Sequence, residues 1–442
     1  MDPKSAPQQG RIRVPRVPGI VPFLVALCLA VAAAGMTWKA WDMFGPGRRP
    51  MLQGWDDSFY YFWLPAVVID HSLDFTSQVA HSGTIEPGAR DAALAGPRTA
   101  TGLLPTKYPP GWAIGSLPFF LAARGLAPAG STGFEPIYLI SVWLGQLAYA
   151  AAGIAFAISM IRRLVPNGSA AVAVLVTWLA SPLVYYQTVR LSLSHSQVFA
   201  LAMTVFWLAL GVEDGDRRRR VWFALGFCGA LLVVTRNVAS VYLAFPAVLA
   251  IRHLRSWRGV GWLALGAAGP AAVQLVVWRM FFGSWIAYSY GGERFDFTHT
   301  HMAEDLFSPR HGWFYWHPLL LVGIVGFIGW AWRRPIAWPW VASLAAIVVL
   351  NAAWPTWWLG SSFGNRGFEV ATFFCMVGLA ALFGAFRERP FLTAILAGVA
   401  GMAIVWNLAL LALFLAHRIP SEGAVTYADA GRAMVRWFAD GR

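Results

Sequence analysis

Residues 136–163 read PIYLISVWLGQLAYAAAGIAFAISMIRR, a long apolar run that ends in two adjacent arginines. Crossing the hydrocarbon core of a bilayer takes about 20 consecutive apolar residues in a helix. This run is long enough, and a basic pair at its end is typical of a cytoplasmic loop. The stretch therefore predicts a transmembrane helix whose C-terminal end is cytoplasmic.

Further segments share this length and composition, and together they predict an all-α polytopic membrane protein. Of the 442 residues, 58% are hydrophobic and only 12% are charged, whereas a soluble domain usually carries about 25% charged residues. This composition excludes a soluble, disordered, collagen-like or coiled-coil chain. We predict a single membrane domain, residues 1–442, with about eleven transmembrane helices over segments 19–37, 136–161, 169–187, 195–212, 221–235, 238–251, 260–282, 317–332, 336–354, 369–386 and 391–416.

The shorter apolar run 111–123 decides the orientation of the chain. It contains Pro118 and has the length of an interfacial or re-entrant segment. If it does not cross and the N-terminus is cytoplasmic, the arginine-rich short loops all fall on the cytoplasmic side, as the positive-inside rule expects. Counting it as a span would place every one of them outside. These loops contain Arg162 and Arg163, Arg217 to Arg220, Arg252, Arg255 and Arg258, Arg333 and Arg334, and Arg387 and Arg389.

This topology explains the formal net charge of +13 without nucleic-acid binding, and it leaves long segments on the outer side. The first outer loop, residues 38–135, is the longest. Its two short apolar stretches, 59–69 and 111–123, are predicted to lie as helices in the membrane interface. The second outer loop and the outer C-terminal tail are residues 283–316 and 418–442.

Basic side chains on the outer side need a separate explanation, because the positive-inside rule disfavours them there. Snorkelling toward lipid head groups is one explanation for any single arginine. Several separate loops each bring a cation to this surface, however, and an anionic ligand explains that convergence better. Arginine geometry suits phosphate in particular. The candidate phosphate-binding residues are Lys107, Arg190, Arg236, Arg310 and Arg366.

Two adjacent carboxylates, Asp56 and Asp57, open the first interfacial stretch in GWDDSFYYFWLPAVVID. Carboxylates at such a position often only cap a helix or interact with its dipole. The alternative is a general base at the membrane–water boundary. Adjacent helical residues point about 100° apart, so we expect the two carboxylates to do different jobs. Which of them is the base stays open.

Further polar and aromatic side chains complete the candidate site. In TKYPPGWAIG, residues 106–115, two prolines fix an extended approach to the apolar run and hold Lys107 and Tyr108 at the interface. His195 is either a hydrogen-bonding group at a helix start or a ligand group. No firm metal-ligand spacing and no nucleotide-binding glycine loop occurs, so we expect neither a metal nor a cofactor. The candidate substrate-binding residues are Tyr60, Tyr108, His195 and His311.

In their order and predicted side of the membrane, these motifs resemble the GT-C superfamily of integral-membrane glycosyltransferases. The bacterial aminoarabinose transferase and protein O-mannosyltransferase relatives are the most similar groups. The resemblance covers most of the chain in layout. In motif it rests on Asp56 and Asp57, on residues 107–110, on Arg310 and His311, and on Arg366.

The resemblance implies an inverting, metal-independent hexosyl- or pentosyltransferase with its active site on the extracytoplasmic side of the cell (inner) membrane. The implied donor is a sugar on a polyprenyl phosphate such as undecaprenyl phosphate, and the acceptor is a cell-envelope glycan, lipid or protein. Asp56 matches the candidate base, whereas Asp57 stands where the family often has glutamate. Lys107 matches the lysine that meets the donor phosphate, although Tyr108 departs from the Lys-Pro-Pro pattern. Arg310 and Arg366 match outer-loop basic positions.

Other functions stay open on the sequence. A secondary transporter often carries inverted repeats and ionisable groups near the bilayer midplane, but no repeat is found and the candidate groups lie at one surface. An O-antigen ligase or polymerase would also use outer arginines and histidines, but it would not need Asp56. A structural or assembly subunit would leave the outer arginines unexplained.

Overall fold

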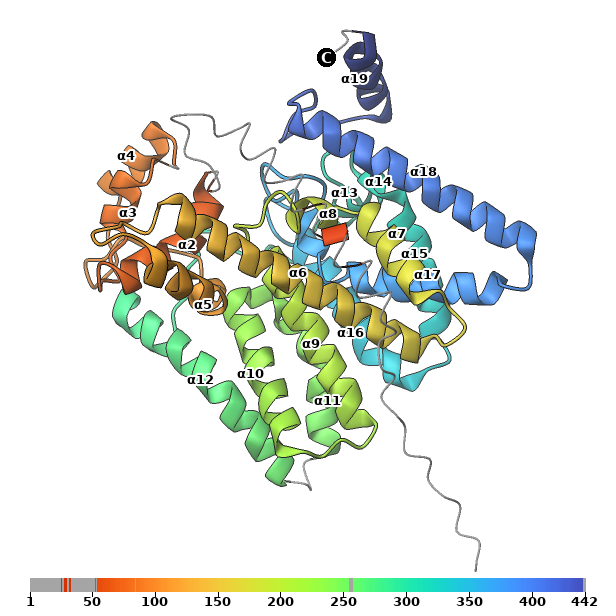
Figure 1. Cartoon of the computed structure of the whole chain (residues 1–442), viewed down its shortest axis with the longest axis horizontal. Coiled ribbons are helices and arrows are strands. Elements are labelled where there is room, and N and C mark those ends of the chain that lie inside the picture. The colour runs from red at the N-terminus through yellow and green to blue at the C-terminus, as the bar shows by residue number, and fades with distance from the viewer. Residues whose placement is uncertain are drawn as a thin grey trace, which may run out of the picture.

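The computed structural model describes residues 25, 28, 29, 32 and 52 and the ranges 54–83, 85–253 and 257–439. Within these residues all regular structure is helical, which confirms the predicted all-α class for the described part (Figure 1). The predicted first span, 19–37, falls almost entirely outside the described residues. The α-helices are α2 (Trp55–Val68), α3 (Thr76–His81), α4 (Pro87–Ala95), α5 (Gly111–Leu126), α6 (Pro136–Leu164), α7 (Ala170–Leu179), α8 (Leu183–Tyr186), α9 (His195–Glu213), α10 (Arg219–Thr235), α11 (Ala244–Arg252), α12 (Trp257–Phe282), α13 (Met302–Phe307), α14 (Trp313–Trp316), α15 (Pro318–Ala331), α16 (Trp338–Ala352), α17 (Thr372–Phe386), α18 (Pro390–Leu415) and α19 (Tyr427–Ala439). Short 3-10 helices are η1 (Asn237–Leu243), η2 (Pro335–Ala337) and η3 (Arg366–Phe368).

The predicted spans from residue 136 onward coincide with helices. Among the described residues, five stretches are long and apolar enough to cross a membrane, namely α6, α9, α12, Pro335–Ala352 and α18. Four shorter apolar helices are α7, Asn237–Arg252, α15 and α17. The number of crossings and the topology stay predictions. The predicted segment 169–187 is divided, because α7 ends before Pro182, which fits poorly inside a helix.

Glycines allow the apolar helices to approach one another closely. A Cβ atom at Gly226 of α10 would collide with the carbonyl oxygen of Leu263 in α12, and one at Gly266 of α12 would collide with that of Phe223. Helices α15 and α17 meet in the same way at Gly323 and Gly378. Small residues at such crossings are typical of membrane helices, which gain packing rather than hydrophobic energy when they associate.

The two apolar stretches predicted in the first long loop are helices, α2 and α5, and they lie with α3 and α4 at one end of the molecule (Figure 1). Their aromatic side chains form a packed core rather than a free surface. Tyr61 and Phe120 are fully buried and in edge contact at 6.1 Å between ring centroids. Each such aromatic residue buries a large apolar area. This packing fixes the N-terminal end of α2 in place.

Residues far apart in the chain are joined beside this end of the molecule. The side-chain amide of Gln197 in α9 donates to the carbonyl oxygen of Gly111 at 2.8 Å and to Thr235 Oγ1 at 3.2 Å. It therefore ties the start of α5 to the end of α10. Trp63 of α2 donates its indole N–H to the carbonyl oxygen of Tyr108 at 3.2 Å. These contacts bring the start of α2, the approach to α5 and the end of α10 to one place.

Candidate active site

A cavity of about 390 Å³ opens where these segments meet. Its walls come from the start of α2, the approach to α5, the start of α9, the break after α10, the loop before α13, and the segment before α17. Seven of the residues predicted from the sequence line it, whereas Asp57, Arg190, Arg310 and His311 do not. The seven are Asp56, Tyr60, Lys107, Tyr108, His195, Arg236 and Arg366.

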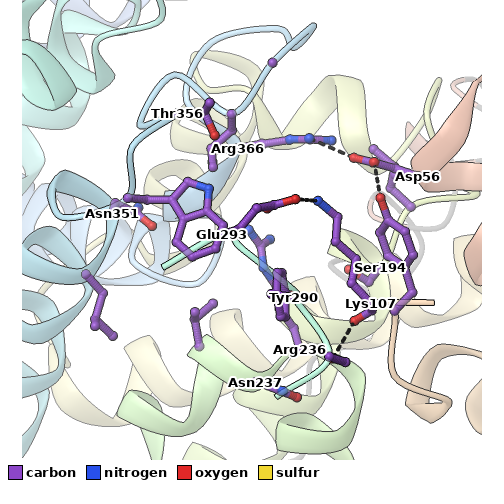
Figure 2. Close-up of a pocket in the computed structure, with 18 of the residues that line it drawn as sticks. Asp56, Lys107, Ser194, Arg236, Asn237, Tyr290, Glu293, Asn351, Thr356 and Arg366 are labelled. Carbon is purple, nitrogen blue, oxygen red and sulfur yellow. Dashed lines mark hydrogen bonds and ion pairs between the residues drawn. The ribbon is translucent and has the colours of Figure 1, made fainter. Parts of the chain in front are cut away.

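Asp56 faces the cavity and is held by two hydrogen-bond donors. Arg366 Nη2 donates to Asp56 Oδ2 at 2.8 Å, and the hydroxyl of Tyr108 donates to Asp56 Oδ1. Figure 2 shows the guanidinium of Arg366 pointing at the carboxylate across the pocket. Burial raises the pKa of Asp56, but the charge of Arg366 and these hydrogen bonds outweigh it, so the pKa lies below its ordinary value. Asp56 is therefore ionised at neutral pH.

Asp57 points away from the cavity, as the 100° offset between adjacent helical residues predicts. It is fully buried, and its Oδ2 accepts a hydrogen bond from Arg190 Nε at 2.8 Å. Arg190, predicted to bind phosphate, is therefore engaged in an ion pair with a buried carboxylate outside the cavity. Only Asp56 of the acidic pair can reach a molecule in the cavity.

Arg236 lies at the break between α10 and η1 and is paired with a carboxylate that the sequence reading missed. Its Nη1 donates to Glu369 Oε1 at 2.8 Å and lies 3.3 Å from His195 Nδ1. Glu369 is only 5% exposed and is not among the lining residues. A signal was present, because Glu369 opens the predicted span 369–386, and an ionisable residue there is a functional indication.

Lys107 reaches into the cavity from the approach to α5. Its Nζ lies 2.6 Å from Glu293 Oε1 and 5.7 Å from the centroid of the Tyr290 ring. Both partners of the ion pair are partly exposed, with side-chain exposures of 32% and 45%. Such a pair contributes little to stability, about 0–1 kcal/mol. Lys107 is therefore available to another anion at low cost.

Arg310 and His311 lie behind the wall of the cavity. The guanidinium of Arg310 stacks on the ring of Trp358 at 3.5 Å and lies 3.5 Å from Glu422 Oε1. His311 is fully buried, and its Nδ1 contacts the carbonyl oxygen of Trp358 at 3.0 Å. Trp358 and Glu422 line the cavity, whereas Arg310 and His311 do not. Arg310 and His311 can therefore affect a bound molecule only through these lining residues.

The turn that carries Arg366 is held from behind by buried polar groups. Asn365 Oδ1 accepts from the backbone N–H of Gly367 at 3.0 Å, and Asn365 Nδ2 donates to Asp305 Oδ1 at 2.7 Å. Burial raises the pKa of Asp305 to about 8, so this carboxyl is mainly protonated at neutral pH.

The rest of the lining is aromatic and neutral polar. The rings of Tyr60 and Tyr108 are in edge contact at 4.9 Å, and Ser194 Oγ lies 3.3 Å from the Tyr60 hydroxyl. Tyr290 and Trp354 also line the cavity, with ring centroids 5.7 Å apart. Among the described residues, no group of three or more His, Cys, Asp and Glu side chains is placed to hold a metal ion.

A solved structure is similar to this chain in fold. No protein-family model matches the chain, and no curated protein matches it. The crystal structure of ArnT from Cupriavidus metallidurans in the apo state is similar, with a TM-score of 0.50 and 17% sequence identity over 91% of this chain and 67% of that one. The chain therefore shares the fold of this structure. The predicted resemblance is thereby confirmed for the fold, which is that of an aminoarabinose transferase.

Proposed function

We propose that this membrane protein is a glycosyltransferase that moves a sugar from a polyprenyl-phosphate donor to an acceptor hydroxyl at the outer face of the membrane. The observation that carries the proposal is the cavity in which the ionised Asp56 lies 2.8 Å from Arg366 and shares the walls with Lys107 and Arg236. A base and a set of cations in one cavity are what transfer from a phosphate leaving group requires. The GT-C fold agrees with this chemistry.

In the proposed reaction, the oxygen of the acceptor hydroxyl attacks the anomeric carbon of the donor sugar, and Asp56 accepts the proton of that hydroxyl. The bond between that carbon and the phosphate oxygen breaks, and the polyprenyl phosphate leaves with the electron pair. A single displacement inverts the anomeric centre. Each carboxylate oxygen has two acceptor positions, so Asp56 can bind the acceptor while Arg366 and Tyr108 hold its orientation.

The cations of the cavity stabilise the charge that grows on the leaving phosphate. Arg366 and Arg236 offer the forked donors that suit phosphate, and Lys107 adds a point charge. Their protein partners neutralise them, so the donor must compete with Glu293 for Lys107. The partly exposed pair makes Lys107 the easiest cation for an arriving phosphate to reach.

The side of the membrane follows from the predicted topology. The segments that form the cavity lie at or next to the predicted outer loops, and the arginine-rich loops lie at the other ends of the helices. A polyprenyl phosphate spanning the outer leaflet would present its head group at this level. The acceptor is proposed to be a cell-envelope glycan, lipid or protein hydroxyl.

Binding and turnover of the purified full-length protein in lipid nanodiscs test the proposal. We expect saturable binding of undecaprenyl phosphate, weakened by Lys107→Gln, and transfer of sugar from undecaprenyl-phosphate-linked donors that is abolished by Asp56→Asn. Transfer that survives Asp56→Asn would favour a ligase-like or polymerase-like enzyme. Failure to bind undecaprenyl phosphate would remove the proposed donor and favour the transporter.

A further inference from the structure

Two arginines that line the cavity are each paired with a carboxylate, and the two carboxylates differ in their access to the cavity. The carboxylate of Asp56 lines the cavity with a side-chain exposure of 32%, whereas that of Glu369 has an exposure of 5% and lies behind the lining. The guanidinium groups of Arg366 and Arg236 both line it. One pair therefore presents its carboxylate and its cation, and the other presents its cation alone.

Glu369 contacts two lining side chains at once. Its Oε1 accepts from Arg236 Nη1 at 2.8 Å, and its Oε2 lies 3.7 Å from His195 Nδ1. It follows directly after η3, so the short segment that carries Arg366 into the cavity also carries the anchor of Arg236. A single segment thus sets the positions of both guanidinium groups.

The electrostatics explain why such an anchor is needed. Burial and the charge of Arg366 both oppose the charge on Arg236, whereas the carboxylate of Glu369 favours it, so the pKa of Arg236 lies above its ordinary value. A buried cation without a partner is strongly destabilised. Without Glu369, Arg236 would turn toward solvent or toward other acceptors and leave the cavity wall.

We infer that Glu369 is a positioning residue that holds Arg236 and His195 in the wall of the cavity. Arg236 and His195, held in this way, would bind the anionic phosphate of a lipid-linked donor. Asp56, which Arg366 and Tyr108 orient, is then the carboxylate assigned to the acceptor. The inference rests on the proposed function, since it assigns a division of labour within that site. It separates a rigid phosphate-binding half from a half that exchanges a proton.

A double-mutant cycle on the full-length protein in nanodiscs tests this inference, with undecaprenyl phosphate as the probe. Glu369→Gln keeps the size of the side chain and removes its charge. We expect it to weaken undecaprenyl phosphate binding about tenfold, and to raise KM for the donor while kcat changes less than threefold. Arg236→Gln should weaken binding at least as much. The double variant should bind no more weakly than Arg236→Gln alone.

The control cycle uses Arg387 and Glu388, an exposed pair with an N–O distance of 3.0 Å. Arg387→Gln and Glu388→Gln should leave binding unchanged. Tighter binding in Glu369→Gln would overturn the inference, because Glu369 would then compete with phosphate. Additive losses of binding in the double variant would overturn it as well. So would a fall of kcat in Glu369→Gln by the same factor as the rise of the donor KM.

Two further comparisons keep the inference separate from folding and from the proposed function. If Glu369→Gln does not fold, Arg236→Gln is compared with the double variant, whose neutral pair avoids an unpaired buried charge. Equal binding supports positioning, and weaker binding in the double variant contradicts it. If Arg236→Gln itself binds like the wild type, the proposed phosphate site fails, whatever Glu369 does.

Discussion

Arg366 Nη2 lies 2.8 Å from Asp56 Oδ2, although 310 residues separate the two in the chain. The pair joins the start of α2 to the segment before α17. Two segments that are far apart in the sequence therefore form one wall of the cavity. It also lowers the pKa of the carboxyl that is proposed to act as the base, against the effect of burial.

Asp56→Asn should abolish sugar transfer and leave folding and undecaprenyl phosphate binding nearly unchanged, because it removes the proton acceptor but keeps the shape. Asp57→Asn provides the matched comparison. Asp57 is fully buried against Arg190, so its loss should destabilise the protein by about 3 kcal/mol and lower activity only through folding. Turnover and thermal unfolding of both variants separate the two roles. Full turnover in Asp56→Asn with none in stable Asp57→Asn would exchange them.

The acid limit of activity should respond to Arg366. A base with a lowered pKa stays ionised as the pH falls, so kcat/KM should decline only below about pH 4, the ordinary carboxyl range. Arg366→Gln removes the main cation that lowers the pKa of Asp56, so the variant should have a higher Asp56 pKa and an acid limb at higher pH. The measurement is kcat/KM against pH for both proteins. An unmoved acid limb in the variant would mean that another group controls it.

Lys107 and Arg310 should differ in their effect on the donor. Lys107→Gln should raise the donor KM about tenfold and change stability by less than about 1 kcal/mol, because its pair with Glu293 is partly exposed. Arg310→Gln should change the donor KM less than twofold, since Arg310 stacks on Trp358 behind the wall. Donor titrations under steady-state conditions compare them. Equal losses in the two variants would contradict the assigned positions.

Asp305 should make stability depend on pH. Burial raises its pKa from the ordinary range to about 8, so the stability linked to its neutral form is fully present below about pH 4. This stability is lost as the pH rises through the folded pKa, with a limiting slope of about 1.4 kcal/mol per pH unit. Asp305→Asn cannot ionise and should remove this loss. Thermal unfolding at pH 6 and pH 9 tests it, with the exposed Asp91→Asn as the control. Wild type and Asp305→Asn losing stability equally between those pH values would contradict the assignment.

Helix positions were largely predictable because they depend on local properties of the chain. An apolar run of about 20 residues can satisfy its backbone in a membrane only as a helix. Helices α6, α9, α12 and α18 therefore lie where their composition predicts them. Helix α5 was predictable from its shorter apolar run, although Pro118 lies within it, and its position in the membrane interface stays a prediction.

The candidate site was predictable only in part, because it depends on the direction of side chains from distant segments. The sequence indicated that cations and carboxylates gather on one side, and it named Asp56, Lys107 and Arg366. Only the tertiary structure separated Asp56 from Asp57, since a rotation of about 100° per residue puts one in the cavity and the other against Arg190.

What the sequence by itself determined is thus the class of the protein, the helical segments and the kinds of charge at the site. The tertiary structure decided which charges meet. Arg190 and Arg310, which were predicted to bind phosphate, lie outside the cavity lining, and Glu369 lies behind Arg236. The physical reason is that the apolar composition of a segment determines whether that segment forms a helix. An ion pair, in contrast, forms only where packing brings two segments within about 4 Å of each other.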